Sequence, residues 1–372
     1  MDFSAQERQH YARHFSLPDF GLAGQKRLKA TKVLVVGAGG LGSPLLLYLA
    51  AAGIGQIGIV DDDVVAASNL QRQVLYGKSD LGLLKVEVAK SRLQQLNPHI
   101  EIHTYPERLT VANALDLISD YDIVADGTDN FPTRYLVNDA CVLAGKTNVY
   151  ASIFRFEGQV AVFNHLRSDG SRGPNYRHLF PEPPPPNTVP NCAEAGVLGV
   201  LPGIIGSMQA NEIIKIAAGL EVSLDGHLFL FDAATLTNRI LKIPTQSQVK
   251  IDKLSVPAAY CNLPTEIKQL SPTQFNNLKT QGRTFQLIDV REAYEYELDH
   301  MNGESMPLSD LNRHITHIAK DHVVIVHCQS GARSQQAIQK LRDQFGFDNL
   351  YNLKGGLLAW RAFQATLVTA EQ

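Results

Sequence analysis

The chain has 372 residues, long for one domain and sufficient for two, and its 44% hydrophobic and 19% charged content is that of a globular protein. Its formal net charge of −3 gives no electrostatic reason to expect nucleic acid or an anionic membrane as a partner. The sparse cysteines (Cys141, Cys192, Cys261 and Cys328) form no CxxC pair, which is typical of a reducing compartment. Residues 1–10 are too polar for a signal peptide and the apolar stretch 45–52 is too short to span a bilayer, so we expect a cytoplasmic protein.

A strand, a glycine-rich turn and a helix are predicted near the N-terminus. Residues 32–36 are apolar and β-branched, and they lead directly into the glycine loop, residues 37–42, which contains Gly37, Gly39, Gly40 and Gly42. A helical apolar segment follows over 43–52, so backbone N–H groups can approach a phosphate at the helix N-terminus. A second strand, 56–60, ends in Asp61, where a carboxylate can reach ribose hydroxyls. The pattern predicts a Rossmann-like half.

Polar side chains after this half decide between two kinds of nucleotide chemistry. The side chains in question are Asn69, Arg72, Lys85, Asp129 and Asn130. Hydride transfer has no use for so many polar groups, whereas attack of a carboxylate on an α-phosphorus gathers charge that Arg, Lys and Mg²⁺ stabilise. Asp129 follows the apolar stretch 122–125, at a carboxyl end of the sheet, and is therefore a candidate Mg²⁺ ligand. The residues favour ATP-dependent nucleotidyl transfer over an NAD-dependent oxidoreductase.

Each residue also has a purely structural interpretation. Asp61 could simply end its strand, and Arg72 or Lys85 could be solvated helix charges. Asp129 with Asn130 could be a helix cap. The functional interpretation fails only if every one of these structural interpretations is true and the residues fall in this order by coincidence.

That order resembles the ubiquitin-activating superfamily, in particular the bacterial MoeB and ThiF adenylyltransferases, over about residues 5–245. The resemblance implies a mostly parallel sheet in a domain over 1–245, with Asp61 on the ribose and Asp129 on Mg²⁺. It implies that Asn69, Arg72 and Lys85 contact the ATP phosphates. It also implies a homodimer in which Arg13 reaches into the partner's active site; the alternative is a surface arginine on the first helix.

One cysteine, Cys192, follows a proline-rich segment. Residues 181–186 read Pro-Glu-Pro-Pro-Pro-Pro and predict an extended loop, with Cys192 soon after it. In the resembled family a cysteine here lies on a mobile loop near the adenylation site and can bond to the activated carrier. The alternative is a buried cysteine at a helix start.

Close relatives often hold a structural zinc with two CxxC pairs, and this chain lacks most of those ligands. The corresponding positions are Asn175 and His178, then Ala258 and Cys261. Structural zinc needs four ligands, nearly always Cys or His, so we expect no zinc. Residues 246–265 are expected to be a linker.

The C-terminal part contains a cysteine in a short anion-binding loop. Residues 323–326 predict a buried strand, residues 328–333 form the Cys328 loop (Cys-Gln-Ser-Gly-Ala-Arg), and a helical pattern follows. The helix N-terminus and Arg333 should lower the pKa of the Cys328 thiol and stabilise a thiolate or persulfide. The alternative is a packed core cysteine.

The Cys328 loop resembles the active loop of rhodanese-type sulfurtransferases, in an α/β domain over 266–372. Four residues separate Cys328 from Arg333, which suits an anion of the size of a sulfane sulfur group. Residues 287–292 and 353–356 with Trp360 resemble other parts of that family. Residues 300–304 depart from it, because the family more often has a proline-containing turn there.

The order of the two domains resembles the MoeZ-like proteins of molybdenum cofactor synthesis. It implies that ATP adenylates the C-terminal glycine of a ubiquitin-like sulfur carrier (MoaD or ThiS type, ending in Gly-Gly). A Cys328 persulfide then gives a thiocarboxylate, with Cys192 as a candidate second thiol. A cysteine desulfurase is an expected upstream sulfur donor.

Alternatives remain open at this point. The same chemistry serves carriers for thiamin or tRNA thiolation. The other classes are an oxidoreductase with a rhodanese module and a non-catalytic scaffold with an idle Cys328.

Overall fold

The computed structural model describes residues 2–184, 196–222, 224–245, 250–254 and 267–370. The chain divides into two compact units, Met1–Cys261 and Asn262–Gln372. Of the predicted linker, residues 246–249 and 255–265 lie outside the described residues, as do Cys192, Ala258 and Cys261. Leu254 lies inside the predicted linker and packs against the core of the first unit. None of the helices described is both long and apolar enough to cross a membrane.

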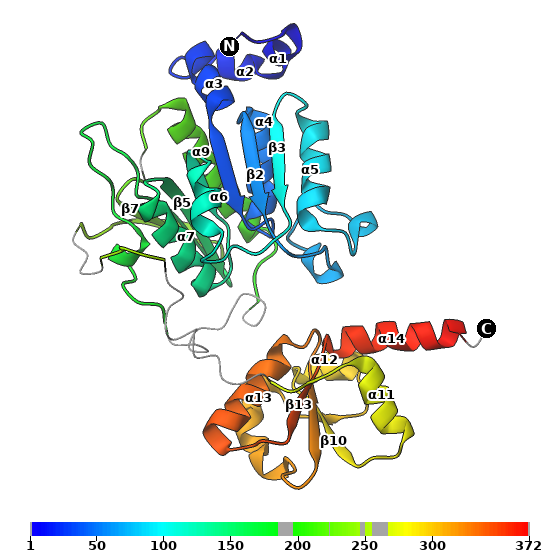
Figure 1. The fold of residues 1–372 in the computed structure, drawn as a ribbon. Coiled ribbons are helices and arrows are strands. Elements are labelled where there is room, and N and C mark those ends of the chain that lie inside the picture. The colour runs from blue at the N-terminus through cyan, green and yellow to red at the C-terminus, as the bar shows by residue number, and fades with distance from the viewer. Residues whose placement is uncertain (1, 185–195, 223, 246–249, 255–266, 371–372) are drawn as a thin grey trace. The chain divides into compact units, whose positions relative to one another are not determined.

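The first unit contains an eight-stranded sheet in the order β3-β2-β1-β4-β5-β6-β7-β8 (Figure 1). The strands are β1 (Lys32–Val36), β2 (Gln56–Val60), β3 (Glu101–Tyr105), β4 (Ile123–Asp126), β5 (Thr147–Phe154), β6 (Glu157–Phe163), β7 (His227–Asp232) and β8 (Thr237–Lys242). The five strands from β3 to β5 are parallel, and β6 to β8 are antiparallel. The predicted mostly parallel Rossmann-like sheet is confirmed.

Helices cover both faces of the central strand β1, which explains why its residues 33–36 are apolar and buried in succession. Val33 and Val35 of β1 face a core shared with α4 (Gly42–Ala52), α5 (Lys85–Leu96) and α9 (Leu201–Ala218). Leu34 and Val36 face the opposite core, shared with α6 (Ala114–Ser119) and α7 (Phe131–Leu143). β1 therefore lies between two helical layers, and the glycine loop follows directly from it.

The N-terminal helices α1 (Ala5–His10), α2 (Ala12–Phe15) and α3 (Gly21–Ala30) lie together at the amino edge of the sheet (Figure 1). A Cβ on Gly53, which ends α4, would lie 2.6 Å from the Tyr11 ring, and Asn97 at the end of α5 donates to the Tyr11 hydroxyl over 2.8 Å. Since α4 and α5 start at the carboxyl edge, their C-terminal ends mark the amino edge. Arg13 on α2 is thus at the edge opposite the glycine loop of its own chain.

The second unit has a five-stranded parallel sheet in the order β11-β10-β12-β13-β9. The strands are β9 (Gln269–Leu270), β10 (Phe285–Asp289), β11 (Glu304–Ser305), β12 (Val323–His327) and β13 (Leu350–Leu353). α13 (Ala332–Phe345) and the 3-10 segment η4 (Leu308–His317) pack on one face, and α11 (Pro272–Thr280) and α14 (Gly356–Ala370) pack on the other. α12 (Ala293–Leu298) follows β10. This confirms the smaller α/β domain.

Residues 300–304, where the resembled family more often has a proline, form a turn by other means. Asn302 has a φ of 59°, in the left-handed region that Asn tolerates better than most residues. Its backbone N–H donates to His300 Nδ1 over 3.1 Å, and the His300 ring stacks on Tyr296 with ring centroids 4.4 Å apart. A local side-chain contact therefore fixes the turn that proline would otherwise restrict.

Candidate active sites

Two glycines of the glycine loop, Gly37 and Gly42, pack so tightly against neighbouring backbone that a side chain is excluded at each position. Gly37 has a φ of 95°, and a Cβ there would lie 3.0 Å from the Gly127 carbonyl oxygen. A Cβ on Gly42 would lie 2.1 Å from the Gly37 carbonyl oxygen. The loop is therefore a bare backbone turn at the start of α4, the arrangement that suits a bound phosphate.

Asp61 ties the glycine loop to the end of β2. Its Oδ2 accepts a hydrogen bond from the Ala38 N–H over 2.8 Å, and its Oδ1 accepts from the Asp63 N–H over 2.9 Å. Burial raises the pKa of the Asp61 carboxyl, while the nearby Lys85 ammonium opposes that shift. Asp61 does more than end a strand, because its hydrogen bond from Ala38 stabilises the conformation of the glycine loop.

Lys85 is not a solvated helix charge. Its side chain is 4% exposed at the start of α5, and its Nζ lies 2.7 Å from Oδ2 of Asp63, which is 67% exposed. Burial of an ammonium group is costly unless it is paired, and Asp63 supplies the partner for the buried Lys85 side chain. Asp63 was not among the predicted site residues, and its place in the run of three aspartates from residue 61 is the feature that could have marked it.

Residues 66–73 lie beside the glycine loop. Asn69 Oδ1 accepts from the Ala66 N–H over 3.1 Å, and Arg72 Nη1 donates to the Ser68 carbonyl oxygen over 3.0 Å. A Cβ on Gly40 would lie 3.7 Å from Arg72 Cγ, and one on Gly39 would lie 3.5 Å from Gln73 Nε2. The structure thus brings Arg72 to the glycine loop, together with the buried Gln73.

The loop after β4, residues 126–130, presents one free carboxylate on a fixed backbone. Asp126 is buried, and its Oδ1 accepts from the Thr128 N–H (3.0 Å) and hydroxyl (2.6 Å). Asn130 Oδ1 accepts from the Thr133 N–H over 3.0 Å and so caps α7. Asp129 is exposed and makes no hydrogen bond or ion pair with any residue that the structure describes. The cap interpretation holds for Asn130 and not for Asp129, whose carboxylate fits a Mg²⁺ ligand.

Arg134 supports this loop from α7, and nothing in the sequence except its charge marks it out. It is 7% exposed, its Nη2 donates to the Thr128 carbonyl oxygen over 3.1 Å, and its guanidinium lies 5.1 Å from the centroid of the Tyr150 ring. Burial raises the pKa of Asp126, and the Arg134 charge opposes that shift. The backbone on both sides of Asp129 is therefore anchored.

Of the four positions at which relatives often carry zinc-binding cysteines, the structure describes Asn175 and His178, whereas Ala258 and Cys261 lie outside the described residues. The Asn175 N–H donates to His178 Nδ1 over 3.1 Å, and Asn175 Oδ1 accepts from the Arg177 N–H, so the first two positions form one turn. No group of three or more potential metal-ligating side chains occurs in the described part of the chain. We expect elemental analysis of chelator-washed protein to find no stoichiometric zinc; stoichiometric metal would contradict this.

The second site is the Cys328 loop between β12 and α13. Cys328 is 1% exposed, and its Sγ accepts from the Gly331 N–H over 3.2 Å, with the Ser334 hydroxyl 3.6 Å away. Gly331 has a φ of 95° and caps α13. The Leu357 N–H donates to the Cys328 carbonyl oxygen over 2.9 Å, so the start of α14 closes over the loop. The burial agrees with a core cysteine, but the N–H donor and helix start at Sγ fit a sulfur anion.

Both arginines at the Cys328 loop are paired with carboxylates. Arg333 Nη1 and Nη2 donate to Glu295 Oε2 and Oε1 over 2.5 and 2.7 Å, and these bonds hold the pKa of Glu295 below its usual range. The buried Arg291 pairs with Asp289 and donates through Nη1 to Gln329 Oε1 over 3.2 Å. The unpaired positive charge expected from Arg333 is thus already neutralised.

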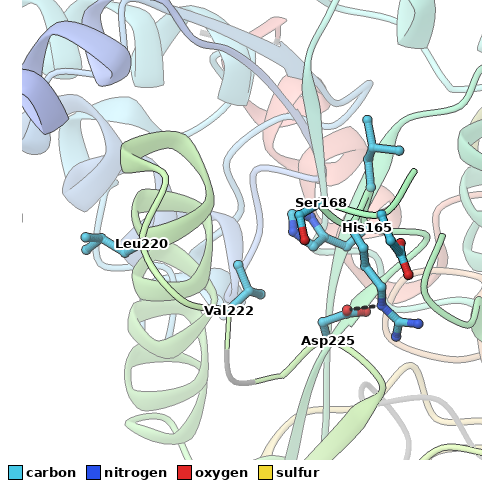
Figure 2. Close-up of a pocket in the computed structure, with 8 residues that line it drawn as sticks. His165, Ser168, Leu220, Val222 and Asp225 are labelled. Atoms are coloured by element: carbon cyan, nitrogen blue, oxygen red, sulfur yellow. Dashed lines mark hydrogen bonds and ion pairs between the residues drawn. The ribbon is translucent and has the colours of Figure 1, made fainter. Parts of the chain in front are cut away.

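The pocket shown in Figure 2 belongs to the first unit and lies away from its glycine loop. Its volume is about 360 Å³, and its lining includes His165, Arg167 and Asp225. Arg167 Nε donates to Asp225 Oδ2 over 2.6 Å (Figure 2). Because Phe163 at the end of β6 pairs with Asn148 near the start of β5, the following residues lie at the amino edge of the parallel strands. The nucleotide loops are at the other edge.

The fold and the two loops together define an adenylyltransferase joined to a sulfurtransferase. Residues 11–251 match the ThiF family, and residues 271–363 match the rhodanese-like domain. The chain belongs to the ThiF family and carries a C-terminal rhodanese-like domain.

Two of the relatives match nearly the whole chain, and a third matches about two thirds of it. The chain is 43% identical over 368 residues to the probable adenylyltransferase/sulfurtransferase MoeZ of Mycobacterium tuberculosis, covering 96% of this chain and 93% of that protein. It is 41% identical to the adenylyltransferase and sulfurtransferase MOCS3 of Mus musculus, over 96% and 86% of the two chains. It is also 53% identical to the sulfur carrier protein adenylyltransferase of Thermus thermophilus, over 65% of this chain and 90% of that protein. MccB of E. coli shares the fold, with a TM-score of 0.57, 20% identity and coverage of 68% and 74%.

Proposed function

We propose that the chain adenylates the C-terminal glycine of a ubiquitin-like sulfur carrier and then sulfurates it, in molybdopterin synthesis. The observation that carries the proposal is the presence, in one chain, of a bare glycine loop beside a free Asp129 carboxylate and of a cysteine loop built for a sulfur anion. The name of the Thermus thermophilus relative refers to a sulfur carrier protein, and a Porphyra purpurea relative, 40% identical, is a probable molybdopterin-synthase adenylyltransferase. Carriers for thiamin or tRNA thiolation are the alternative.

In the first step the carrier carboxylate attacks the α-phosphorus of ATP, and pyrophosphate leaves. The glycine loop cradles phosphate, Asp61 binds ribose, and Asn69, Arg72 and Lys85 contact the phosphates. Asp129 would hold Mg²⁺, and the bound ion would neutralise charge that develops on the phosphate oxygens. The anchoring of Thr128 and Asn130 holds the backbone on both sides of Asp129 and leaves its carboxylate unoccupied.

In the second step a persulfide on Cys328 attacks the acyl carbon, and AMP leaves. A second thiol, for which Cys192 is the candidate, then attacks Cys328 Sγ, so that a disulfide forms and the carrier leaves as a thiocarboxylate. Cys192 is seven positions before Gly199, and a Cβ on Gly199 would lie 2.5 Å from the Gln71 carbonyl oxygen, next to Arg72. The sulfur on Cys328 comes from an upstream donor such as a cysteine desulfurase in the cytoplasm.

The direct test supplies the protein with ATP, Mg²⁺, a sulfur donor and one candidate carrier at a time. Mass spectrometry of the carrier is expected to show replacement of one oxygen by sulfur for the molybdopterin-type carrier. A mass change confined to a thiamin-type carrier would transfer the same chemistry to that pathway. No change with any carrier ending in Gly-Gly would overturn the proposal.

Arg13 enters the proposal only through a second protomer. It is exposed, it has no hydrogen bond or ion pair within the described part of the chain, and it lies at the edge opposite its own glycine loop. Arg13→Ala and Asp129→Ala proteins are each expected to be inactive in pyrophosphate exchange. Mixing them should restore activity, because a mixed dimer contains one site with both residues. Failure of the mixture, with subunit exchange verified by mass, would exclude Arg13 from the partner's site.

A further inference from the structure

Glu295 covers the one arginine that belongs to the Cys328 loop. Its carboxylate takes both terminal nitrogens of Arg333, a bidentate geometry that is stronger than a single contact between ions. The pair is partly shielded, with side chains 23% (Arg333) and 18% (Glu295) exposed. An incoming anion would have to compete with this carboxylate for Arg333.

The position of Glu295 is fixed by its own helix. The Glu292 N–H donates to Glu295 Oε2 over 3.1 Å in the capping arrangement of α12. Glu295 therefore meets Arg333 as an anchored group, and displacing it would break a helix cap as well as an ion pair.

The other arginine at the loop offers no free charge either. Arg291 is 2% exposed and forms a bidentate pair with the fully buried Asp289, while it also donates to the Asp299 carbonyl oxygen over 2.6 Å. His327, next to Cys328, is fully buried, and burial lowers the pKa of its imidazole, which favours the neutral form. The two arginines at the Cys328 loop and the two carboxylates that pair with them therefore sum to zero net charge (Arg291 with Asp289, and Arg333 with Glu295).

We propose that Glu295 is a specificity-determining residue that disfavours small inorganic dianions as sulfur donors and so favours persulfide donors. A dianion such as thiosulfate depends on cationic groups to offset its loss of water, and Glu295 already occupies the arginine of the Cys328 loop. A persulfide brings a single charge on the reacting sulfur, which backbone N–H groups at a helix start can accommodate. The inference rests on the proposed sulfur transfer through Cys328.

Both donors load Cys328 without an external oxidant. With thiosulfate, the Cys328 thiolate attacks the outer sulfur, the sulfur–sulfur bond breaks, and sulfite leaves with the electron pair. With a persulfide, the same attack forms the same Cys328 persulfide and releases the donor thiolate. The two reactions differ in the charge of donor and leaving group, so Glu295 should act on one more than on the other.

The test compares thiosulfate with free cysteine persulfide as donor to the full-length protein, with cyanide as acceptor. In Glu295→Gln the KM for thiosulfate is expected to fall about tenfold, the scale of one charge-assisted contact, and to rise more steeply with salt than in the wild type. The KM for cysteine persulfide should change less than about twofold. Glu295→Asp, which keeps the charge, should restore much of the wild-type discrimination.

Asp299→Asn is the matched control, since Asp299 also pairs with an arginine, Arg361 on α14, and it ends α12. It should leave both KM values unchanged. An equal change for both donors in Glu295→Gln, or a loss of transfer with a folded domain, would show that Glu295 only positions Arg333 and would overturn the inference. Persistence of transfer in Cys328→Ala would instead refute the proposed function.

Discussion

In Asp129→Ala protein, carrier-dependent exchange of pyrophosphate into ATP is expected to fall by about a hundredfold or more, the scale of removing one transition-state charge contact. The reason is that Asp129 contributes only a free carboxylate. Its neighbour Thr128 is held by Asp126 and Arg134, and Asn130 caps α7. Thermal unfolding should therefore remain close to wild type, and thiosulfate-to-cyanide transfer should be intact.

The matched control is Asp116→Ala, because Asp116 is an exposed carboxylate in the first turn of α6 and not on the loop after β4. It should retain full exchange. The Asp129→Ala exchange rate should also respond less to Mg²⁺ concentration than the wild-type rate. Equal loss in both variants would mean that net charge, and not the site, controls adenylation.

The second large effect is expected from Cys328→Ala, which should reduce thiosulfate-to-cyanide transfer to background. The substitution removes the sulfur that accepts a hydrogen bond from the Gly331 N–H. Leaving that buried donor without a partner should also cost about 1–3 kcal/mol in stability of the second unit. Carrier-dependent pyrophosphate exchange should persist, since the glycine loop and Asp129 belong to the first unit.

Cys141→Ala is the control that separates the loss of a reactive thiol from the loss of a buried thiol. Cys141 is also a free, buried cysteine, but it lies within α7, and burial raises the pKa of its thiol. Both activities should survive its replacement. If Cys328→Ala retained sulfur transfer, or abolished pyrophosphate exchange as well, the proposed division between the two units would be wrong.

Both loops could be predicted because their determinants are adjacent in sequence. A β-branched strand, glycines without room for a side chain and a following helix specify the turn after β1. The Cys328 loop is specified in the same way by β12, Gly331 and α13. The conformation of each loop depends on residues that are adjacent in the chain, so it can be predicted without knowledge of the tertiary contacts.

Pairings between distant residues could not be predicted. Glu295 and Arg333 are 38 positions apart, and Lys85 and Asp63 are 22 apart, so only the folded sheet shows which charge meets which. The sequence likewise left open whether Asp129 or Asn130 caps α7, since both residue types can do so. Orientation of the side chains, set by packing, decided in favour of Asn130.

The burial of Cys328 Sγ has a consequence for the lifetime of the sulfur that it carries. Peroxide and small thiols oxidise or strip an accessible persulfide, and oxidation beyond the sulfenic state is largely irreversible. Because only 1% of Cys328 is exposed, a sulfur carried on its Sγ as we propose would be sheltered between loading and delivery. Delivery then favours an acceptor of very small cross-section, and a peptide tail ending in two glycines has no side chains to obstruct its entry.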